Sequence, residues 1–130
     1  VQLEKIINES KFIAEQEKLD AEVSQRATTP RRSILFVNNA WHHASIEIFI
    51  QDETQNEQKL HSWWGQKSNY TISPLIPINT KKIKVSVQSW FLQWSSPYYE
   101  EYFTLSDLPL CLASYGTLFS RSVIRANCNK

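Results

Sequence analysis

The stretch Ile83-Lys84-Val85-Ser86-Val87-Gln88 decides the fold class of this chain. β-Branched apolar residues alternate here with polar ones, so an extended strand would have one apolar and one polar face. Segments of similar character recur along the sequence, separated by turn-forming residues, which is typical of a sandwich of short strands. We therefore expect an antiparallel β-sandwich of about seven strands. The other expected strands are residues 33–37, 45–50, 70–72, 75–78, 98–105 and 113–125.

The composition excludes several classes of function. The chain has 130 residues, enough for one domain, and a net charge of +1, which does not favour a nucleic-acid partner. Glycine occurs only at Gly65 and Gly116, so the glycine-rich loops that hold nucleotide phosphates are absent from the sequence. Aromatic residues are the excess, with five Trp, five Tyr and six Phe. Rings that the core does not use are therefore candidates for function.

Residues 1–26 have apolar residues at helical spacing, whereas the rest of the chain has alternating ones, and they predict an amphipathic α-helix. Leu3, Ile6, Ile7 and Ile13 recur at helical spacing. Pro30 ends the helical pattern, so we expect the β-sandwich domain to comprise residues 27–130. Two roles for the helix remain open at this point. It packs on the domain, a partner or a second copy of the chain, or it is the end of a longer helix in a larger parent chain.

The chain opens on Val1 and contains no methionine. We therefore expect a processed product or a fragment of a longer chain, and we expect it to be secreted or extracellular. Cys111 and Cys128 are the two cysteines, and they lack the spacing of a metal site. Either they form one disulfide that holds the C-terminal tail, or they are two separate thiols.

The sequence contains no recognisable catalytic pattern. The histidines His42, His43 and His61 lack the spacing of a zinc site. Glu47 with Glu101 is one conceivable pair of glycosidase carboxylates, but no motif supports it. We expect a non-enzymatic protein without cofactor or metal, and an all-β hydrolase remains a further alternative.

Two aromatic clusters are the best candidates for a binding surface. One is the run from Trp90 to Tyr99, where strand alternation is lost before a Ser-Ser-Pro turn. The other is Trp63-Trp64, whose backbone we expect to turn at the adjacent Gly65. Rings at loop tips suit an interface that is dry on one side and wet on the other. For any single tryptophan, burial in the core is the alternative.

The order of several motifs resembles the C-terminal β-sandwich of the cholesterol-dependent (thiol-activated) cytolysins. The resemblance extends over residues 33–124. Its motifs are Ser62-Trp63-Trp64-Gly65, Leu75-Ile76-Pro77-Ile78, Lys84-Val85-Ser86-Val87, the loop 90–99, Ser106-Asp107-Leu108-Pro109-Leu110 and Tyr115-Gly116-Thr117-Leu118-Phe119. The resemblance implies docking on cholesterol-rich membranes through loops at one end of the sandwich, with Thr117-Leu118 matching the pair that recognises the sterol.

The sequence departs from the family at its tryptophan-rich undecapeptide, which is missing. Tyr98 and Tyr99 stand where its last two tryptophans would be, while Ser96, Phe91 and Glu100 replace its first tryptophan, its cysteine and its arginine. The resemblance therefore implies a docking module rather than a complete toxin.

We expect a module that binds membrane lipid, including cholesterol, with nearby lysines assisting on an anionic surface. The alternative is a glycan- or protein-binding module whose helical segment contacts a partner. The candidate binding residues are Trp63, Trp64, Trp90, Phe91, Leu92, Trp94, Tyr98, Tyr99, Thr117 and Leu118.

Overall fold

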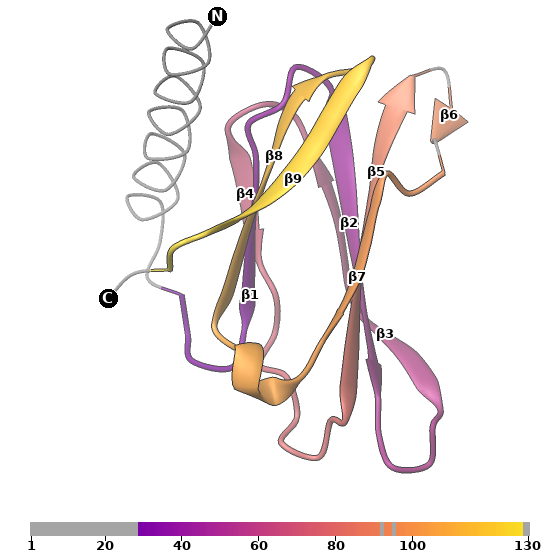
Figure 1. Ribbon diagram of the computed structural model, residues 1–130, viewed down its shortest axis with the longest axis vertical. Coiled ribbons are helices and arrows are strands. Elements are labelled where there is room, and N and C mark those ends of the chain that lie inside the picture. Colours follow the sequence, from indigo (N-terminus) through magenta and orange to yellow (C-terminus); the bar gives the residue numbers. More distant parts are fainter. Residues whose placement is uncertain (1–28, 92, 95, 129–130) are drawn as a thin grey trace, which may run out of the picture.

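Two β-sheets pack face to face in the protein (Figure 1). The structure, a computed structural model, describes residues 29–91, 93–94 and 96–128. The first sheet has the strand order β4-β1-β8-β9. Its strands are β4 (Asn69–Ile72), β1 (Ile34–Asn38), β8 (Leu110–Thr117) and β9 (Ser120–Ala126).

The second sheet has the order β3-β2-β5-β6, and β7 also pairs with β5. A short 3₁₀ helix, η1 (Leu105–Asp107), follows β7 and leads back to the first sheet. The strands are β2 (His43–Gln51), β3 (Glu57–Gly65), β5 (Lys82–Phe91), β6 (Gln93–Trp94) and β7 (Tyr99–Phe103).

The core lies between the two sheets. It contains the apolar residues of the alternating segments, which confirms the prediction made from them. Ile83, Val85 and Val87 of β5 are fully buried, and Ile46 and Ile48 of β2 lie beside them. The first sheet contributes its own alternating set. The buried residues from β1 and β8 are Ile34, Phe36, Leu110 and Leu112.

Strand β1 is buried on both faces, because a second apolar cluster lies on the other side of the first sheet. Leu35 and Val37 of β1 belong to it, with Cys111 and Ala113 of β8. Strands β1 and β8 run parallel, so the expectation of a wholly antiparallel sandwich is wrong for this pair. A strand buried on both faces requires a continuous apolar run, which is what residues 34–37 provide.

Cys111 and Cys128 form a disulfide, which decides between the two alternatives left open by the sequence. Their Cα atoms are 5.5 Å apart. The bond ties the end of the described chain to β8 in the first sheet.

Two of the expected segments need correction, and one strand was not expected. Strand β3 was missed because it lies at the edge of its sheet, where polar residues such as Lys59 are tolerated and one face is exposed. Residues 75–78 form no strand. Pro74 and Pro77 lack the backbone N–H groups that a strand would need there. Ile76, whose apolar side chain suggested a strand, is buried in the core without belonging to one. The expected strand 113–125 is a hairpin that turns after Thr117.

The predicted helix over residues 1–26 lies outside the described residues. No helix in the described part of the chain is long and apolar enough to cross a membrane.

Candidate functional site

Exposed aromatic side chains gather at one end of the sandwich. The β1–β2 loop, the β3–β4 loop, the β5–β6 hairpin and the β8–β9 turn all lie at this end (Figure 1). Phe119 is 95% exposed, Trp41 72% and Trp64 62%. We call this region the aromatic end. Its residues are Trp41, Trp64, Trp90, Trp94, Thr117, Leu118 and Phe119.

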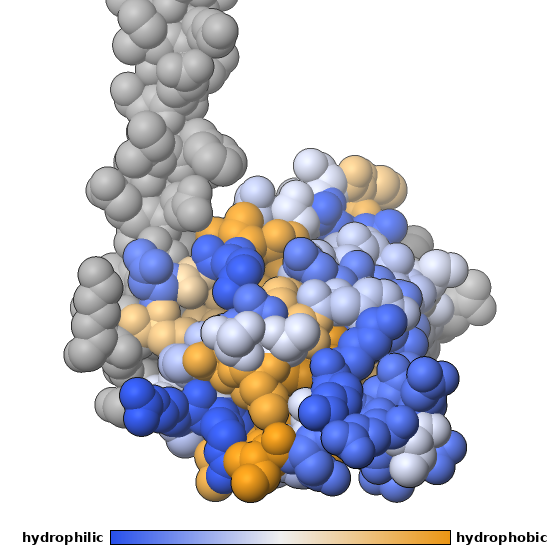
Figure 2. All heavy atoms as spheres, turned by 60° about the horizontal axis from the view of Figure 1, so that its bottom comes forward, coloured by the Kyte–Doolittle hydropathy of each residue, from blue (hydrophilic) through white to orange (hydrophobic). Residues whose placement is uncertain are grey.

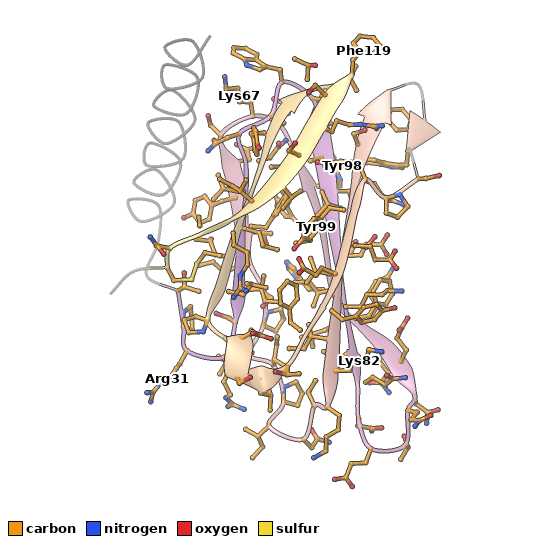
Figure 3. The ribbon with its side chains drawn as sticks, in the orientation of Figure 1. Arg31, Lys67, Lys82, Tyr98, Tyr99 and Phe119 are labelled. Carbon is orange, nitrogen blue, oxygen red and sulfur yellow. A yellow bond between two sulfur atoms is a disulfide. The ribbon has the colours of Figure 1, made fainter. Side chains whose placement is uncertain are left out.

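The β8–β9 turn projects Phe119 from this end (Figure 3). Gly116 has φ +102°, and a Cβ atom there would lie 1.9 Å from the Ser120 carbonyl oxygen, so the turn requires glycine. The Thr117 hydroxyl oxygen accepts a hydrogen bond from the Phe119 backbone N–H at 3.3 Å. Leu118 is half-buried beneath the turn while Phe119 extends outward.

The buried side chain of Asn38 organises the neighbouring loops. Its Nδ2 donates to the carbonyl oxygens of His42 (2.9 Å) and Gly65 (2.8 Å), and its Oδ1 accepts from the Ala40 N–H (3.1 Å). One amide therefore joins the β1–β2 loop to the end of β3. This satisfies its buried polar atoms and fixes the backbone around Trp41.

The β1–β2 loop is also held to the β8–β9 hairpin. The Trp41 N–H donates to the Gly116 carbonyl oxygen at 2.9 Å, and the Asn39 N–H donates to the Ser114 carbonyl oxygen at 2.8 Å. Lys67 of the β3–β4 loop lies over the Trp41 ring, with Nζ 3.1 Å from the ring centroid. These contacts place Trp41 beside the turn that carries Phe119.

A groove of about 420 Å³ lies on the outer face of the second sheet at the same end. It is lined by His43, Trp64, Trp90 and Trp94, which come from four neighbouring strands. His43 pairs with Trp90 across β2 and β5, and Trp90 pairs with Trp94 across β5 and β6. Side chains on one face of adjacent strands stand side by side, so pairing of the strands builds the groove.

Polar groups join the two sheets beneath the aromatic end. Tyr98 OH hydrogen-bonds Ser114 Oγ at 2.6 Å, and Arg121 Nη1 donates to Ser89 Oγ at 2.6 Å. The Arg121 guanidinium also lies over the Tyr98 ring. Burial raises the pKa of Tyr98, which keeps its hydroxyl protonated.

His42 is buried at this junction and faces the Tyr98 ring edge-on, with ring centroids 5.7 Å apart. Its Nδ1 lies 3.0 Å from the His43 carbonyl oxygen, which only accepts, so Nδ1 carries the proton. Burial lowers the pKa of His42, and Arg121 nearby acts in the same direction. The imidazole is therefore held in its neutral form.

The opposite end of the molecule is mainly charged, and we call it the charged end. It comprises the β2–β3 hairpin and the β4–β5 connection (Figure 1). A cavity of about 720 Å³ there is lined by charged groups that include Asp52, Lys82 and Asp107. Figure 2 shows hydrophilic residues over one side of this end and a narrow hydrophobic stripe beside them. Leu75 and Ile78 of the β4–β5 connection are the exposed aliphatic residues in this region.

The structure brings some of the predicted site residues together and separates others. Trp64, Trp90 and Trp94 share the groove, and Thr117 with Leu118 forms the nearby turn. Trp63 lies on the inner face, against Phe36. The side chain of Phe91 and the whole of Leu92 lie outside the described part.

Tyr98 and Tyr99 pack against the core rather than in the groove, and Figure 3 shows both below the tip that carries Phe119. The Tyr99 hydroxyl donates to the Glu101 carboxylate. Within the described residues, no group of three or more His, Cys, Asp or Glu side chains is placed to hold a metal ion.

Trp41, Phe119 and His43 are site residues that the sequence analysis did not select. Phe119 directly follows Thr117-Leu118, which had been selected, so its position next to that pair could have identified it. Trp41 follows the turn-forming pair Asn38-Asn39. No sequence pattern marks His43, because its role depends on which strands pair with β2.

No protein-family model matches the sequence, and no curated protein matches it at a significant level. Solved structures do match. The membrane-binding domain of pneumolysin gives a TM-score of 0.51 at 18% identity, over 78% of this chain and 100% of that chain. A non-hemolytic pneumolysin from Streptococcus pneumoniae gives 0.51 at 18% identity, over 78% of this chain and 24% of that chain.

A disulfide-locked mutant of intermedilysin, solved with human CD59, gives a TM-score of 0.53 at 14% identity. The match covers 75% of this chain and 24% of that chain. This chain therefore spans about a quarter of the length of the whole toxins that it matches. The chain has the β-sandwich fold of the cytolysin membrane-binding domain, which confirms, for the fold, the resemblance inferred from its sequence motifs.

Proposed function

We propose that this chain is a membrane-docking module that places its aromatic end on a lipid surface. The observation that carries the proposal is the exposure of Phe119 and Trp41, at 95% and 72%, on adjacent loops. Solvent-facing rings concentrated at one end of a soluble domain mark an interaction surface. Tryptophan and phenylalanine are also the residues that anchor proteins at the membrane interface.

The exposed side chains supply enough free energy for reversible docking. Transfer of Phe119, Trp41 and part of Leu118 out of water is worth about 5 kcal/mol in total. This is comparable to the marginal, reversible anchoring given by a single acyl chain. Lys67 beside Trp41 adds attraction to anionic headgroups.

Thr117 and Leu118 support sterol recognition as part of the same proposal. They match the family's sterol-binding pair and lie where β8 passes into the turn that carries Phe119, next to the loop that carries Trp41. Thr117 Oγ1 accepts the Phe119 N–H, so its own O–H proton is available to a sterol hydroxyl.

Liposome flotation with and without cholesterol tests the proposal. Wild-type protein is expected to float with cholesterol-containing vesicles, and Trp41→Ala/Phe119→Ala is expected to lose most of this binding. The matched control is Leu75→Ala/Ile78→Ala, which removes exposed apolar side chains at the charged end. Equal flotation of the two double variants would refute docking through the aromatic end.

The same proposal includes a non-enzymatic role and an extracellular location. The matched structures are toxins and a membrane-binding domain, and a disulfide between Cys111 and Cys128 suits an oxidising compartment. Contact of residues 1–26 with a partner remains a prediction from the sequence.

Glycan recognition is the second candidate, and the groove tryptophans favour it, since they lie on a sheet face rather than at a loop tip. One pneumolysin structure, matched at a TM-score of 0.50, is described as a sugar-binding protein. A glycan-array signal that persists without any liposome binding would favour this candidate over docking.

A further inference from the structure

The rings of the groove form a corner rather than a flat platform. The centroids of Trp90 and Trp94 are 5.4 Å apart, with their planes at 61°. His43 and Trp64 are 6.2 Å apart, with their planes at 50°. A group that enters the groove therefore meets aromatic surfaces from more than one direction. This geometry fits a compact, rounded group better than the face of a sugar ring, which stacks on a flat platform.

Two exposed rings outside the groove, those of Trp41 and Tyr102, are paired with cations of the protein itself. Lys67 lies over Trp41 at 3.1 Å from the centroid, and Lys82 lies over Tyr102 at 4.2 Å. In the described part of the chain, no Lys or Arg lies over Trp64, Trp90 or Trp94. The negative π faces of the groove are therefore left for a cation from outside.

The lining of the groove selects the kind of cation. Among the described residues, the groove is lined by His43 and three tryptophans and by no carboxylate. A primary ammonium or a guanidinium brings N–H donors that need acceptors, whereas a quaternary ammonium has none. The volume of about 420 Å³ is within the range of small-ligand sites.

We propose that the groove of His43, Trp64, Trp90 and Trp94 binds the trimethylammonium group of choline lipid headgroups. The inference rests on the proposed membrane-docking function, because the groove lies at the same end of the sandwich as Phe119 and Trp41. It adds a headgroup preference to that function, separate from the apolar contacts made by the loop tips.

Ligands that differ only at the ammonium group test the chemistry in solution. Phosphocholine is titrated by NMR against phosphoethanolamine and against the neutral isostere 3,3-dimethylbutyl phosphate. Phosphocholine is expected to bind about tenfold more tightly than either, because the isostere lacks the charge and phosphoethanolamine lacks the methyl groups. Equal binding of phosphocholine and its neutral isostere would overturn the proposal, as would no binding of phosphocholine.

Variants locate the site. Trp64→Ala and Trp94→Ala are each expected to weaken phosphocholine binding by about fivefold or more, whereas Tyr102→Ala, which removes an exposed ring at the charged end, leaves it unchanged. Trp64→Phe is expected to retain part of the affinity because it keeps an aromatic face. Circular dichroism establishes that each variant is folded. Equal affinity in Trp64→Ala and Tyr102→Ala would remove the groove as the site.

Vesicles separate this inference from the proposed function. Wild-type protein is expected to prefer phosphatidylcholine over phosphatidylethanolamine vesicles at equal cholesterol, since both headgroups carry no net charge and differ only at the ammonium group. Binding that is indifferent to choline would overturn the inference and leave membrane docking intact. Phosphocholine binding without any vesicle binding would overturn the lipid as the source of the choline group, together with the docking function. A Trp64-dependent glycan signal without phosphocholine binding would assign the groove to a sugar.

Discussion

The two ends of the sandwich differ in whether their exposed side chains are covered by a charged partner. At the charged end, Lys82 covers the Tyr102 ring, Lys81 pairs with Glu53, and Lys84 pairs with Glu57. At the aromatic end, Lys67 lies over Trp41, but in the described part of the chain no lysine or arginine lies over Phe119 or the groove tryptophans.

The contrast shows that exposure of a ring is not enough to mark a binding surface. A ring beneath a lysine presents a charge to its surroundings, so the charged end remains well hydrated. The uncovered rings of the aromatic end present apolar surface that a partner can bury. The ends differ through their loops, and at the aromatic end Asn38 holds those loops in place.

The largest effect is expected from Asn38→Ala. The substitution leaves the carbonyl oxygens of His42 and Gly65 and the N–H of Ala40 without their buried partner, at a cost of about 4 kcal/mol in the free energy of unfolding. Urea denaturation measures the loss. The control at the charged end is Asp52→Ala, which removes an exposed turn contact to Thr54 and is expected to change the midpoint little. Similar losses in both variants would contradict the organising role of Asn38.

Removal of the disulfide separates stability from docking. Cys128→Ala opens a loop closed over a sequence separation of 17 residues, and the expected cost is about 3 kcal/mol. The bond joins Cys128 to β8, and neither cysteine belongs to the aromatic end. Thermal denaturation should therefore show the loss, while flotation below the melting temperature stays at the wild-type level. A parallel loss of flotation would mean that docking depends on more than the aromatic end.

A smaller effect is expected from Gly116→Ala. The left-handed backbone and the approach of the Ser120 carbonyl oxygen make any Cβ costly, by about 2 kcal/mol. The turn that presents Phe119 is displaced, so vesicle binding is expected to fall as well. Ser122→Ala, in the regular part of the same hairpin, is the control for both measurements.

The smallest effect is a pH dependence of stability. Burial lowers the folded-state pKa of both His42 and His61 below the usual value of 6.5. Below pH 6.5 the unfolded state then binds more protons than the folded state. The contribution of the two histidines to the free energy of unfolding is therefore complete above pH 6.5 and is lost as the pH falls below it. Urea denaturation from pH 7.5 to 5 measures the slope, and His42→Asn should reduce it. An unchanged slope in that variant would assign the effect to other groups.

The fold class was predictable because β5 and β2 record burial in their alternation. Ile83, Val85 and Val87 face the core, as their spacing indicates. Strand β3 was not, since an edge strand with one exposed face carries residues such as Lys59 that locally resemble a turn. Alternation in the sequence indicates a strand with one buried face, and it is weak where that face is only partly buried, as in β3.

The sequence predicted that exposed aromatic residues form the candidate site, but it did not predict which residues belong to it. Trp63 and Trp64 form one cluster in the sequence, yet on a strand adjacent side chains point to opposite faces, so only Trp64 reaches the groove. His43 joins Trp90 through the pairing of β2 with β5. Such pairings connect distant parts of the chain, and no local pattern encodes them.

The central place of β1 has a consequence for how the protein is made. This apolar strand lies near the start of the described chain, but Ile34 is paired with Leu110 of β8, close to its end. Contacts between such distant segments slow folding. During synthesis, residues 34–37 emerge long before β8. Until β8 follows, the apolar side chains of β1 and the unpaired hydrogen-bonding groups along its edge are open to other chains. The sandwich is therefore expected to aggregate most readily as an incomplete chain, and to be safest once β8 has left the ribosome.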